Sequence, residues 1–351
     1  MADRHVADDD ATQPVPRPEP RADAELDSTR TMPDLPSQSG GARKSRPAAA
    51  PRQSETSRPA GGPPADYRKR LSRRIGAVVL SILFSVFVTW LVLGTVPGQV
   101  LDTMAMGAVA EFLGDATWTH SLLRSTVSVP VALLAAALIG LIGVARGRLT
   151  LAGRALGLIA GAIVTAKLLK ALVERPDLGV TGALQNSLPS GHVTFVAALS
   201  VALVMVVPTW MRSVVAVCGW AATTLAGIAV MASSWHRLSD VIVAILVVGV
   251  WGLTLAPLEV RRRRDQQLAH WAGLAALGVL AVGIVVVVAC TPAVVSAVSA
   301  DGFPSPGRHL DPAPFLEVRP ALFRILALGS TLCIAGLAGA VVHEVDRQAR
   351  D

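Results

Sequence analysis

From residue 75 onward the chain is built from long apolar runs, each closed by polar or charged residues. The runs cover residues 75–96, 126–145, 151–173, 191–207, 214–233, 239–257, 270–290 and 322–342. An α-helix of about 20 residues crosses the roughly 30 Å apolar core of a bilayer, and the fourth run is near the short limit. The pattern predicts an all-α, polytopic transmembrane helical bundle with eight spans.

Basic residues stand beside every second connection between these runs. They precede the first run at residues 68–74 and recur as Arg146 and Arg148, Arg212, residues 261–264, and Arg347 and Arg350. Positively charged connections stay on the cytoplasmic side of a membrane. We therefore predict an integral, multi-pass protein of the plasma (inner) membrane with both termini cytoplasmic. The extracytoplasmic loops are then 97–125, 174–190, 234–238 and 291–321.

The first 74 residues have a different composition and lack apolar runs. They hold eleven of the 23 prolines, no Phe and no Trp. Because so little apolar surface cannot offset the entropy of ordering, we predict a disordered, Pro/Arg-rich cytoplasmic tail. The expected organisation is this tail at 1–74, a six-span core at 75–257, and a C-terminal part at 258–351. The last part adds two transmembrane helices, a Pro-rich outer loop and a short cytoplasmic end.

The formal net charge of +7 is compatible with nucleic-acid binding, but the basic residues lie beside apolar spans. There they act as orientation signals, so we expect contact with the lipid bilayer and no nucleic-acid partner. The sequence does not identify any protein partners. Cys218, Cys290 and Cys333 all lie within apolar runs. They are expected to pack rather than to form disulfides or to bind a metal.

Polar side chains gather at three helix ends that the predicted topology places on the extracytoplasmic side. The third run ends with Lys167, Lys170 and Arg175, the fourth begins with residues 189–192, and His236, Arg237 and Asp240 join the fifth to the sixth. Ionisable groups near a bilayer are costly. Their collection at one depth therefore predicts a functional site.

The segment Pro189-Ser190-Gly191-His192 has the features of an anion-binding helix start. Proline suits the first turn, glycine lets a ligand approach the backbone, and the free amide hydrogens and the Ser190 hydroxyl can bind a phosphate. His192 can protonate a leaving oxygen, because imidazole titrates near neutral pH. An ordinary helix cap followed by an interfacial histidine would show the same residues.

His236 and Asp240 are four residues apart, which places them on one helical face or across a helix start. A carboxylate beside imidazole fixes its tautomer and stabilises the cation that forms when the other nitrogen attacks an electrophile. We therefore predict His236 as a nucleophile. The alternative is an interfacial histidine near Trp235 with Asp240 as a helix-start carboxylate. No further ligand motif accompanies the pair, so no metal site is predicted.

Lys167, Lys170 and Arg175 supply positive charge at the end of the third run. Arginine through its planar fork, and lysine as a mobile point charge, can bind a dianionic phosphate. Alternatively, these long side chains only carry their charges to the membrane interface. An anion-binding helix start, an oriented histidine, a second histidine and basic residues are together what phosphoryl transfer uses. The sequence therefore predicts that reaction.

These motifs make the chain similar to the type 2 phosphatidic acid phosphatase family, the membrane relatives of the vanadium haloperoxidases. The resemblance covers the six spans from about 75 to 257. Family members carry a Lys/Arg-Pro motif at the end of span three, Pro-Ser-Gly-His at the start of span four, and a Ser-Arg…His…Asp motif between spans five and six. Residues 189–192 match the second motif fully, and His236 and Asp240 match the end of the third.

The resemblance implies a metal-independent hydrolase of phosphoric monoesters or pyrophosphates that needs no cofactor. In this scheme His236 attacks phosphorus to give a phosphohistidine, Asp240 orients it and His192 protonates the leaving group. Water then releases phosphate. Ser190, Gly191 and the basic residues would hold the phosphoryl oxygens and stabilise the transition state.

Two features depart from the family pattern. Val230 stands where the arginine of the third motif is expected, with Ala229 in place of its serine. Neither Lys170 nor Lys167 has the family's spacing to Arg175, and we favour Lys170 because it is nearer the interface. Arg237 is a candidate replacement for the missing arginine. However, adjacent residues on a helix point about 100° apart, so it would have to reach around.

The function favoured by these residues is an integral membrane lipid phosphatase acting on a lipid phosphate or pyrophosphate at the extracytoplasmic face. Candidate substrates are polyprenyl pyrophosphate, phosphatidate and phosphatidylglycerophosphate, and the sequence does not select among them. One alternative is a phosphoryl-group transferase to a lipid or sugar acceptor. Another, motivated by Val230, is a catalytically weak protein that binds or transports lipid phosphates.

Overall fold

The computed structural model describes residues 65–113, 129–180, 186–257, 266–305 and 309–350, and the regular secondary structure in these ranges is helical. The helices are α1 (Ala65–Gly94), α2 (Val96–Leu113), α4 (Val129–Ala145), α5 (Leu149–Leu172), α6 (Gly191–Val206), α7 (Arg212–Ala232), α8 (Leu238–Leu255), α9 (Gln266–Ala300), α10 (Ala313–Val318) and α11 (Pro320–Arg350). The predicted all-α class is confirmed. The predicted tail up to residue 64 and the basic run at 261–264 lie outside the described residues.

Six of the described helices are long and apolar enough to cross a membrane, which makes the chain a multi-pass membrane protein. They are Tyr67–Gly94, Leu149–Leu172, Arg212–Ala232, Leu238–Leu255, Trp271–Ala300 and Pro320–Gln348. The runs predicted at 126–145 and 191–207 contain shorter apolar helices, Leu133–Ala145 and Gly191–Val206. Each of the eight predicted runs thus contains a helix, and the crossing of these two short helices stays a prediction.

Helix α8 lies at the centre of the bundle. It packs against α1, α5, α6 and α11, and 72% of its 18-residue span is buried. Val241, Ala244 and Val248 on this helix are fully enclosed. Because His236 and Asp240 stand at the start of α8, they are attached to the most enclosed of the spans.

Helices α9 and α11 form a closely packed pair, which glycine makes possible. A Cβ atom at Gly336 on α11 would lie 2.3 Å from the backbone nitrogen of Leu280 on α9. Small residues allow two helix backbones to approach in this way inside a membrane. The two helices predicted beyond the six-span core therefore pack as one unit, and α11 joins that unit to α2, α7 and α8.

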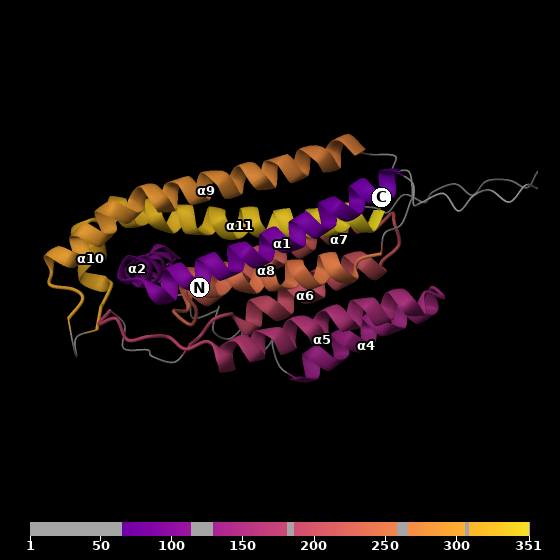
Figure 1. Ribbon diagram of the computed structural model, residues 1–351, viewed down its shortest axis with the longest axis horizontal. Helices are drawn as coiled ribbons and strands as arrows, with labels where there is room; N and C mark the ends of the chain where they lie inside the picture. Colours follow the sequence, from indigo (N-terminus) through magenta and orange to yellow (C-terminus); the bar gives the residue numbers. More distant parts are fainter. Residues whose placement is uncertain (1–64, 114–128, 181–185, 258–265, 306–308, 351) are drawn as a thin grey trace, which may run out of the picture. The chain divides into compact units, whose positions relative to one another are not determined.

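The two ends of the bundle are formed by different helix termini (Figure 1). At one end the start of α1 meets the ends of α8 and α11. Arg74 donates hydrogen bonds to Gln348 Oε1 (2.7 Å) and to the Ala256 carbonyl (2.8 Å) there. Arg146, at the end of α4, donates to the Val206 carbonyl at the end of α6. Helix α8 begins at the opposite end, so the residues around His236 lie away from these basic side chains. Which end faces the cytoplasm stays a prediction from the positive-inside rule.

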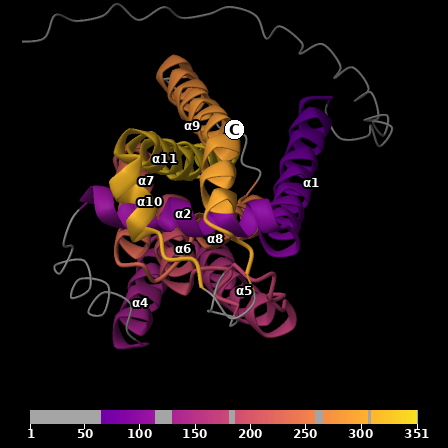
Figure 2. The ribbon, with the colours of Figure 1, turned by 90° about the vertical axis from the view of Figure 1, so that its left-hand side faces the viewer.

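Helix α2 corrects the prediction of a loop over 97–125. It packs against α7, α9 and α11 and crosses the end of the bundle (Figure 2). Gln99, Asp102 and Thr103 are buried on it. They recur at a spacing of three and four residues and so share one helical face. Because these polar residues interrupt its apolar stretch, a search for membrane-length runs misses the helix.

Two further boundaries differ from the sequence-based expectation. Residues 65–74, predicted as part of the tail, are the first turns of α1, because straight-chain basic residues form helix readily. Helix α9 continues past Pro292 to Ala300, although we predicted a loop from residue 291. A single proline removes only one backbone hydrogen bond, and Val294 and Val298 beyond it are fully buried.

The loop before α10 pairs with the loop after α5. Ser305 donates a backbone hydrogen bond to the Gly179 carbonyl (3.2 Å), and Leu310 donates one to the Val180 carbonyl (2.8 Å). The Pro-rich loop of the C-terminal part therefore contacts the segment that follows Arg175.

Candidate functional site

The turn between α7 and α8 presents His236 at the start of α8. Ser234 adopts the left-handed conformation there, with φ of 56°. The backbone amides of Trp235 and His236 both donate to the Val230 carbonyl, at 3.0 and 3.2 Å. Val230 has no arginine side chain, unlike the corresponding position of the family motif. Its carbonyl nevertheless fixes the backbone of the candidate nucleophile, His236.

Asp240 is fully buried and organises the start of α8. Its Oδ2 atom lies 3.2 Å from His236 Nδ1 and accepts hydrogen bonds from the Arg237 amide (3.0 Å) and the Ser187 hydroxyl (2.7 Å). A carboxylate at Nδ1 favours the tautomer in which the proton is on Nδ1 and Nε2 carries the lone pair. The predicted pair is therefore brought together in the geometry that makes Nε2 nucleophilic.

Ser190 connects the second motif to the third. Its backbone amide donates to the Asp240 carbonyl (3.0 Å), and its hydroxyl accepts from the Val193 amide (3.4 Å) as the N-cap of α6. The residue is completely buried. The observed contacts of Ser190 are thus structural, and its contact with phosphate stays a prediction.

Gly191 and His192 lie at the accessible start of α6. Gly191 is exposed, and a Cβ atom there would meet nothing within 4 Å. A ligand can therefore reach the backbone amides at this helix start. The His192 ring lies 5.5 Å from the Trp235 ring, measured between centroids. His192 is also within electrostatic reach of His236 and Lys170, so the two histidines occupy the same site.

Arg175 is a buried cation, with an exposed fraction of 5%. None of its three guanidinium nitrogens has a hydrogen-bond partner among the described residues. Burial is the main cause that lowers the pKa of Arg175, and Arg237 adds to it, while Asp102 and Asp240 act in the opposite direction. A buried guanidinium without hydrogen bonds costs several kcal/mol, roughly, unless an anion binds to it.

The other predicted basic residues separate into two groups. Lys170 is half-buried and within electrostatic reach of Asp240, whereas Lys167 is exposed, nearly one turn earlier on α5. The geometry thus favours Lys170 as the partner of Arg175 in the first motif. Arg237 is buried and is within electrostatic reach of Arg175. We expected Arg237 to lie within a helix and to reach around it toward the phosphate. That expectation is wrong, because Arg237 has an extended backbone (φ −82°, ψ 169°) and is the N-cap residue of α8.

Three residues at this site were not predicted from the sequence: Gln99, Asp102 and Ser239. Asp102 on α2 accepts hydrogen bonds from the amide (2.9 Å) and the hydroxyl (2.6 Å) of Ser239. Gln99 on the same helix donates to the Pro176 carbonyl (3.0 Å), next to Arg175. Helix α2 therefore holds both α8 and the Arg175 segment. The only sequence signal was the recurrence of polar residues within an otherwise apolar stretch.

The enclosed charges of the site do not cancel. Lys170, Arg175 and Arg237 are basic, and Asp102 and Asp240 are the carboxylates within their reach. These buried and half-buried groups are three cations and two carboxylates, whereas Glu174 and Asp177 beside Arg175 are exposed. Such an arrangement suits an anionic ligand in front of His236.

The raised pKa of Asp102 predicts that the stability of the folded protein depends on pH. Burial first, and the charge of Asp240 second, raise the pKa of Asp102 from 3.8 to about 6. The folded state binds the Asp102 proton more tightly than the unfolded state does. Protonation of Asp102 therefore adds to the free energy of unfolding, fully below pH 4, and this contribution is lost as the pH rises through 6. The shift in pKa corresponds to a decrease of about 3 kcal/mol in the free energy of unfolding.

The Asp102→Asn variant keeps an oxygen that can accept from the Ser239 amide but does not titrate. Between pH 4 and 7 we expect its thermal stability in detergent to fall less than that of the wild type. Asp240, Arg175 and Arg237 face this position in both proteins, so their contributions largely cancel. Identical pH profiles would show that Asp102 does not titrate in this range.

Within the described residues no group of three His, Cys, Asp or Glu side chains is arranged to hold a metal ion. Comparisons of the chain with protein-family models, with curated proteins and with solved structures gave no match.

Proposed function

We propose that this membrane protein is a lipid phosphatase, which hydrolyses a lipid phosphate or pyrophosphate at the extracytoplasmic face through a phosphohistidine. One observation carries the proposal. The buried Arg175 guanidinium has no hydrogen-bond partner among the described residues, and it is within electrostatic reach of Asp240, which orients His236. An anion-binding group and an activated nucleophile are the two requirements of phosphoryl transfer.

The proposed reaction has two steps. His236 Nε2 attacks the phosphorus, the bond from phosphorus to the lipid oxygen breaks, and His192 gives its proton to that oxygen. Neutral His192 then takes a proton from water as the water attacks the phosphohistidine. The bond from phosphorus to nitrogen breaks, inorganic phosphate leaves, and both histidines return to their starting states. The positive charge on the imidazole during the first step is stabilised by Asp240.

Arg175, Lys170 and Arg237 have the task of stabilising the phosphoryl oxygens. In the transition state negative charge is spread over these oxygens, and positive groups already in place stabilise it without reorganisation. Arg237 takes the role that an arginine at position 230 has in the family. Val230 itself is uncharged and fully buried in the apolar core, so it supplies no contact to a phosphate.

The loss of that arginine motivates the alternatives. A site with one phosphate contact fewer can bind a lipid phosphate and turn it over slowly, as a binding or transport protein would. A phosphohistidine can also pass its phosphoryl group to a lipid or sugar hydroxyl instead of water.

The test is phosphate release by the purified protein in detergent, with a chelator present. Polyprenyl pyrophosphate, phosphatidate and phosphatidylglycerophosphate are offered separately, and we expect inorganic phosphate from at least one of them. Addition of a sugar or lipid alcohol separates the alternatives, because a transferase would move the phosphoryl group onto it. If the protein binds these lipids but forms neither product, the phosphatase proposal is wrong.

A further inference from the structure

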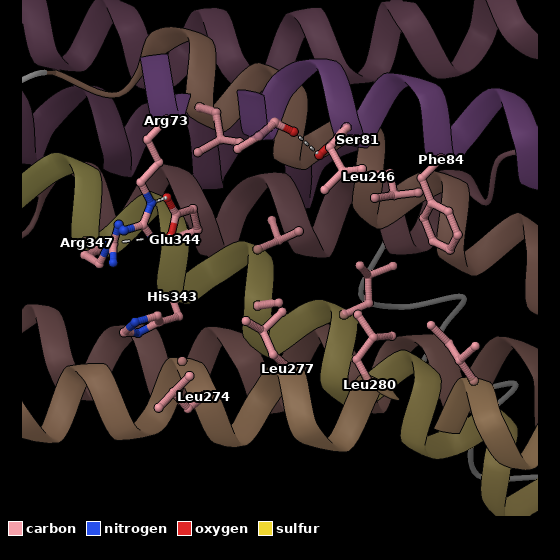
Figure 3. A pocket seen from close by; sticks show the side chains of 18 residues that line it. Arg73, Ser81, Phe84, Leu246, Leu274, Leu277, Leu280, His343, Glu344 and Arg347 are labelled. Atoms are coloured by element: carbon pink, nitrogen blue, oxygen red, sulfur yellow. Dashed lines mark hydrogen bonds and ion pairs between the residues drawn. The ribbon is translucent and has the colours of Figure 1, made fainter. Parts of the chain in front are cut away.

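A second feature lies at the other end of the bundle, where an apolar groove of about 550 Å³ runs between α1, α8, α9 and α11 (Figure 3). Leu80 and Phe84 line it from α1, Leu246 from α8, and Leu277 and Ile284 from α9. Arg73, His343, Glu344 and Arg347 stand at one end of it. The groove is separate from the site around His236, because Arg73 and Glu344 belong to the end where α1 begins and α11 finishes.

The groove follows from how the helices pair. Helix α1 packs against α8 and α2, whereas α9 packs against α11 and α2. Figure 2 shows α1 on one side and the α9 and α11 pair on the other. Gly273 on α9 leaves room for the His343 ring, since a Cβ atom there would lie 2.5 Å from His343 Cδ2. The imidazole therefore reaches the charged end of the groove.

This charged end has more positive than negative charge. Arg73 makes two hydrogen bonds to the Glu344 carboxylate, at 3.0 and 2.8 Å, and Arg347 lies 3.6 Å from the same carboxylate. Two guanidinium groups thus share one acid. The Arg73 side chain is 50% exposed, so it can bind a second anion without leaving Glu344.

The length of the groove matches one leaflet of a bilayer. From Arg73 to Phe84 the chain advances eleven residues along α1, and from Gly273 to Ile284 it advances eleven along α9. At 1.5 Å per residue this is about 16 Å, roughly half of the 30 Å apolar core. A chain that begins with a charged group at Arg73 would therefore end near the middle of the membrane.

We propose that this groove binds one anionic phospholipid from the leaflet at the Arg73 end, which is the cytoplasmic leaflet in the predicted orientation. The phosphate lies between Arg73 and Arg347, and one acyl chain lies along Leu80, Leu277 and Ile284. The surplus positive charge selects an anionic headgroup, and the apolar walls accept the chain. This site is independent of the proposed phosphatase activity, because it shares no residue with that site.

The test is native mass spectrometry of the full chain in detergent with phosphatidylglycerol or phosphatidylcholine of identical acyl chains. We expect the wild type to retain one phosphatidylglycerol with a preference of about fivefold, because Arg73, Arg347 and Glu344 leave one surplus positive charge, and one such charge near anionic lipid contributes about fivefold. The Arg73→Gln, Arg347→Gln double variant should lose that preference. The matched control is Arg68→Gln with Lys69→Gln, which removes the same charge from exposed positions of α1 outside the groove.

A second variant tests the apolar walls separately from the charges. Leu277 is 54% exposed, so Leu277→Trp should be tolerated in folding while it fills the groove. We expect it to release the bound phosphatidylglycerol. Equal retention of both lipids by the wild type would overturn the proposal, as would equal losses in the two double variants. A mass spectrum that shows dimers of the chain without bound lipid would also overturn the proposal, because a second copy of the chain would then occupy the groove.

Discussion

Replacement of His236 by alanine is expected to abolish phosphate release, with a decrease of at least about a thousandfold in kcat. In the proposed reaction Nε2 of this imidazole forms the bond to phosphorus, and among the described residues no other histidine is hydrogen-bonded to Asp240. The side chain is largely enclosed, with an exposed fraction of 11%. The measurement is inorganic phosphate released from the lipid that the wild type hydrolyses.

Two further variants show whether this loss is chemical. Asp240→Asn should reduce the rate strongly, because an amide neither fixes the imidazole tautomer nor stabilises its cation. His309→Ala removes an exposed histidine from the Pro-rich loop and should leave the rate unchanged. An acid-labile phosphoprotein should form with the wild type and be missing with His236→Ala. If His236→Ala folds and retains the wild-type rate, the nucleophile is a different residue.

The second large effect is expected at Arg175, where activity and stability should change in opposite directions. In the proposed reaction Arg175→Gln removes a charge-assisted contact to the transferring phosphoryl group, so kcat/KM should fall about a hundredfold to a thousandfold. It also removes a buried cation that has no hydrogen-bond partner among the described residues. The midpoint of thermal unfolding in detergent, measured without phosphate, should therefore be as high as that of the wild type or higher.

Added inorganic phosphate distinguishes the two roles of Arg175. A ligand that binds only the folded state raises the unfolding midpoint, so phosphate should stabilise the wild type and have much less effect on Arg175→Gln. Arg324→Gln is the control, since Arg324 is an exposed arginine on α11. If Arg175→Gln is unstable but fully active, Arg175 has a structural role and does not bind phosphate.

The membrane helices could be predicted from the sequence because a bilayer imposes a minimum length on an apolar run. Six of the eight predicted runs have spanning length in the structure, and the other two form shorter apolar helices. Helix α2 could not be found in this way. Its Gln99, Asp102 and Thr103 face the interior of the protein, and only tertiary contacts reveal which way a polar face points.

The candidate site was predicted in part for the same reason. The spacing of His236 and Asp240 is local, so the sequence contains the information that they meet. Ser187 and Asp102, by contrast, reach the start of α8 from 53 and 137 residues away. No local pattern indicates such contacts. Arg237 was judged by helical geometry, which does not apply to a residue with an extended backbone at a helix start.

The pairing of the two loops has a consequence for the last two transmembrane helices. The backbone amides of Ser305 and Leu310 donate hydrogen bonds to the carbonyls of Gly179 and Val180. Helices α9 and α11 also pack against α2, which carries Gln99 and Asp102. A chain shortened to the six spans of the family pattern would lose both supports at once. We therefore expect α9 and α11 to stabilise the segment around Arg175, and a chain ending at residue 257 to hold this arginine less firmly.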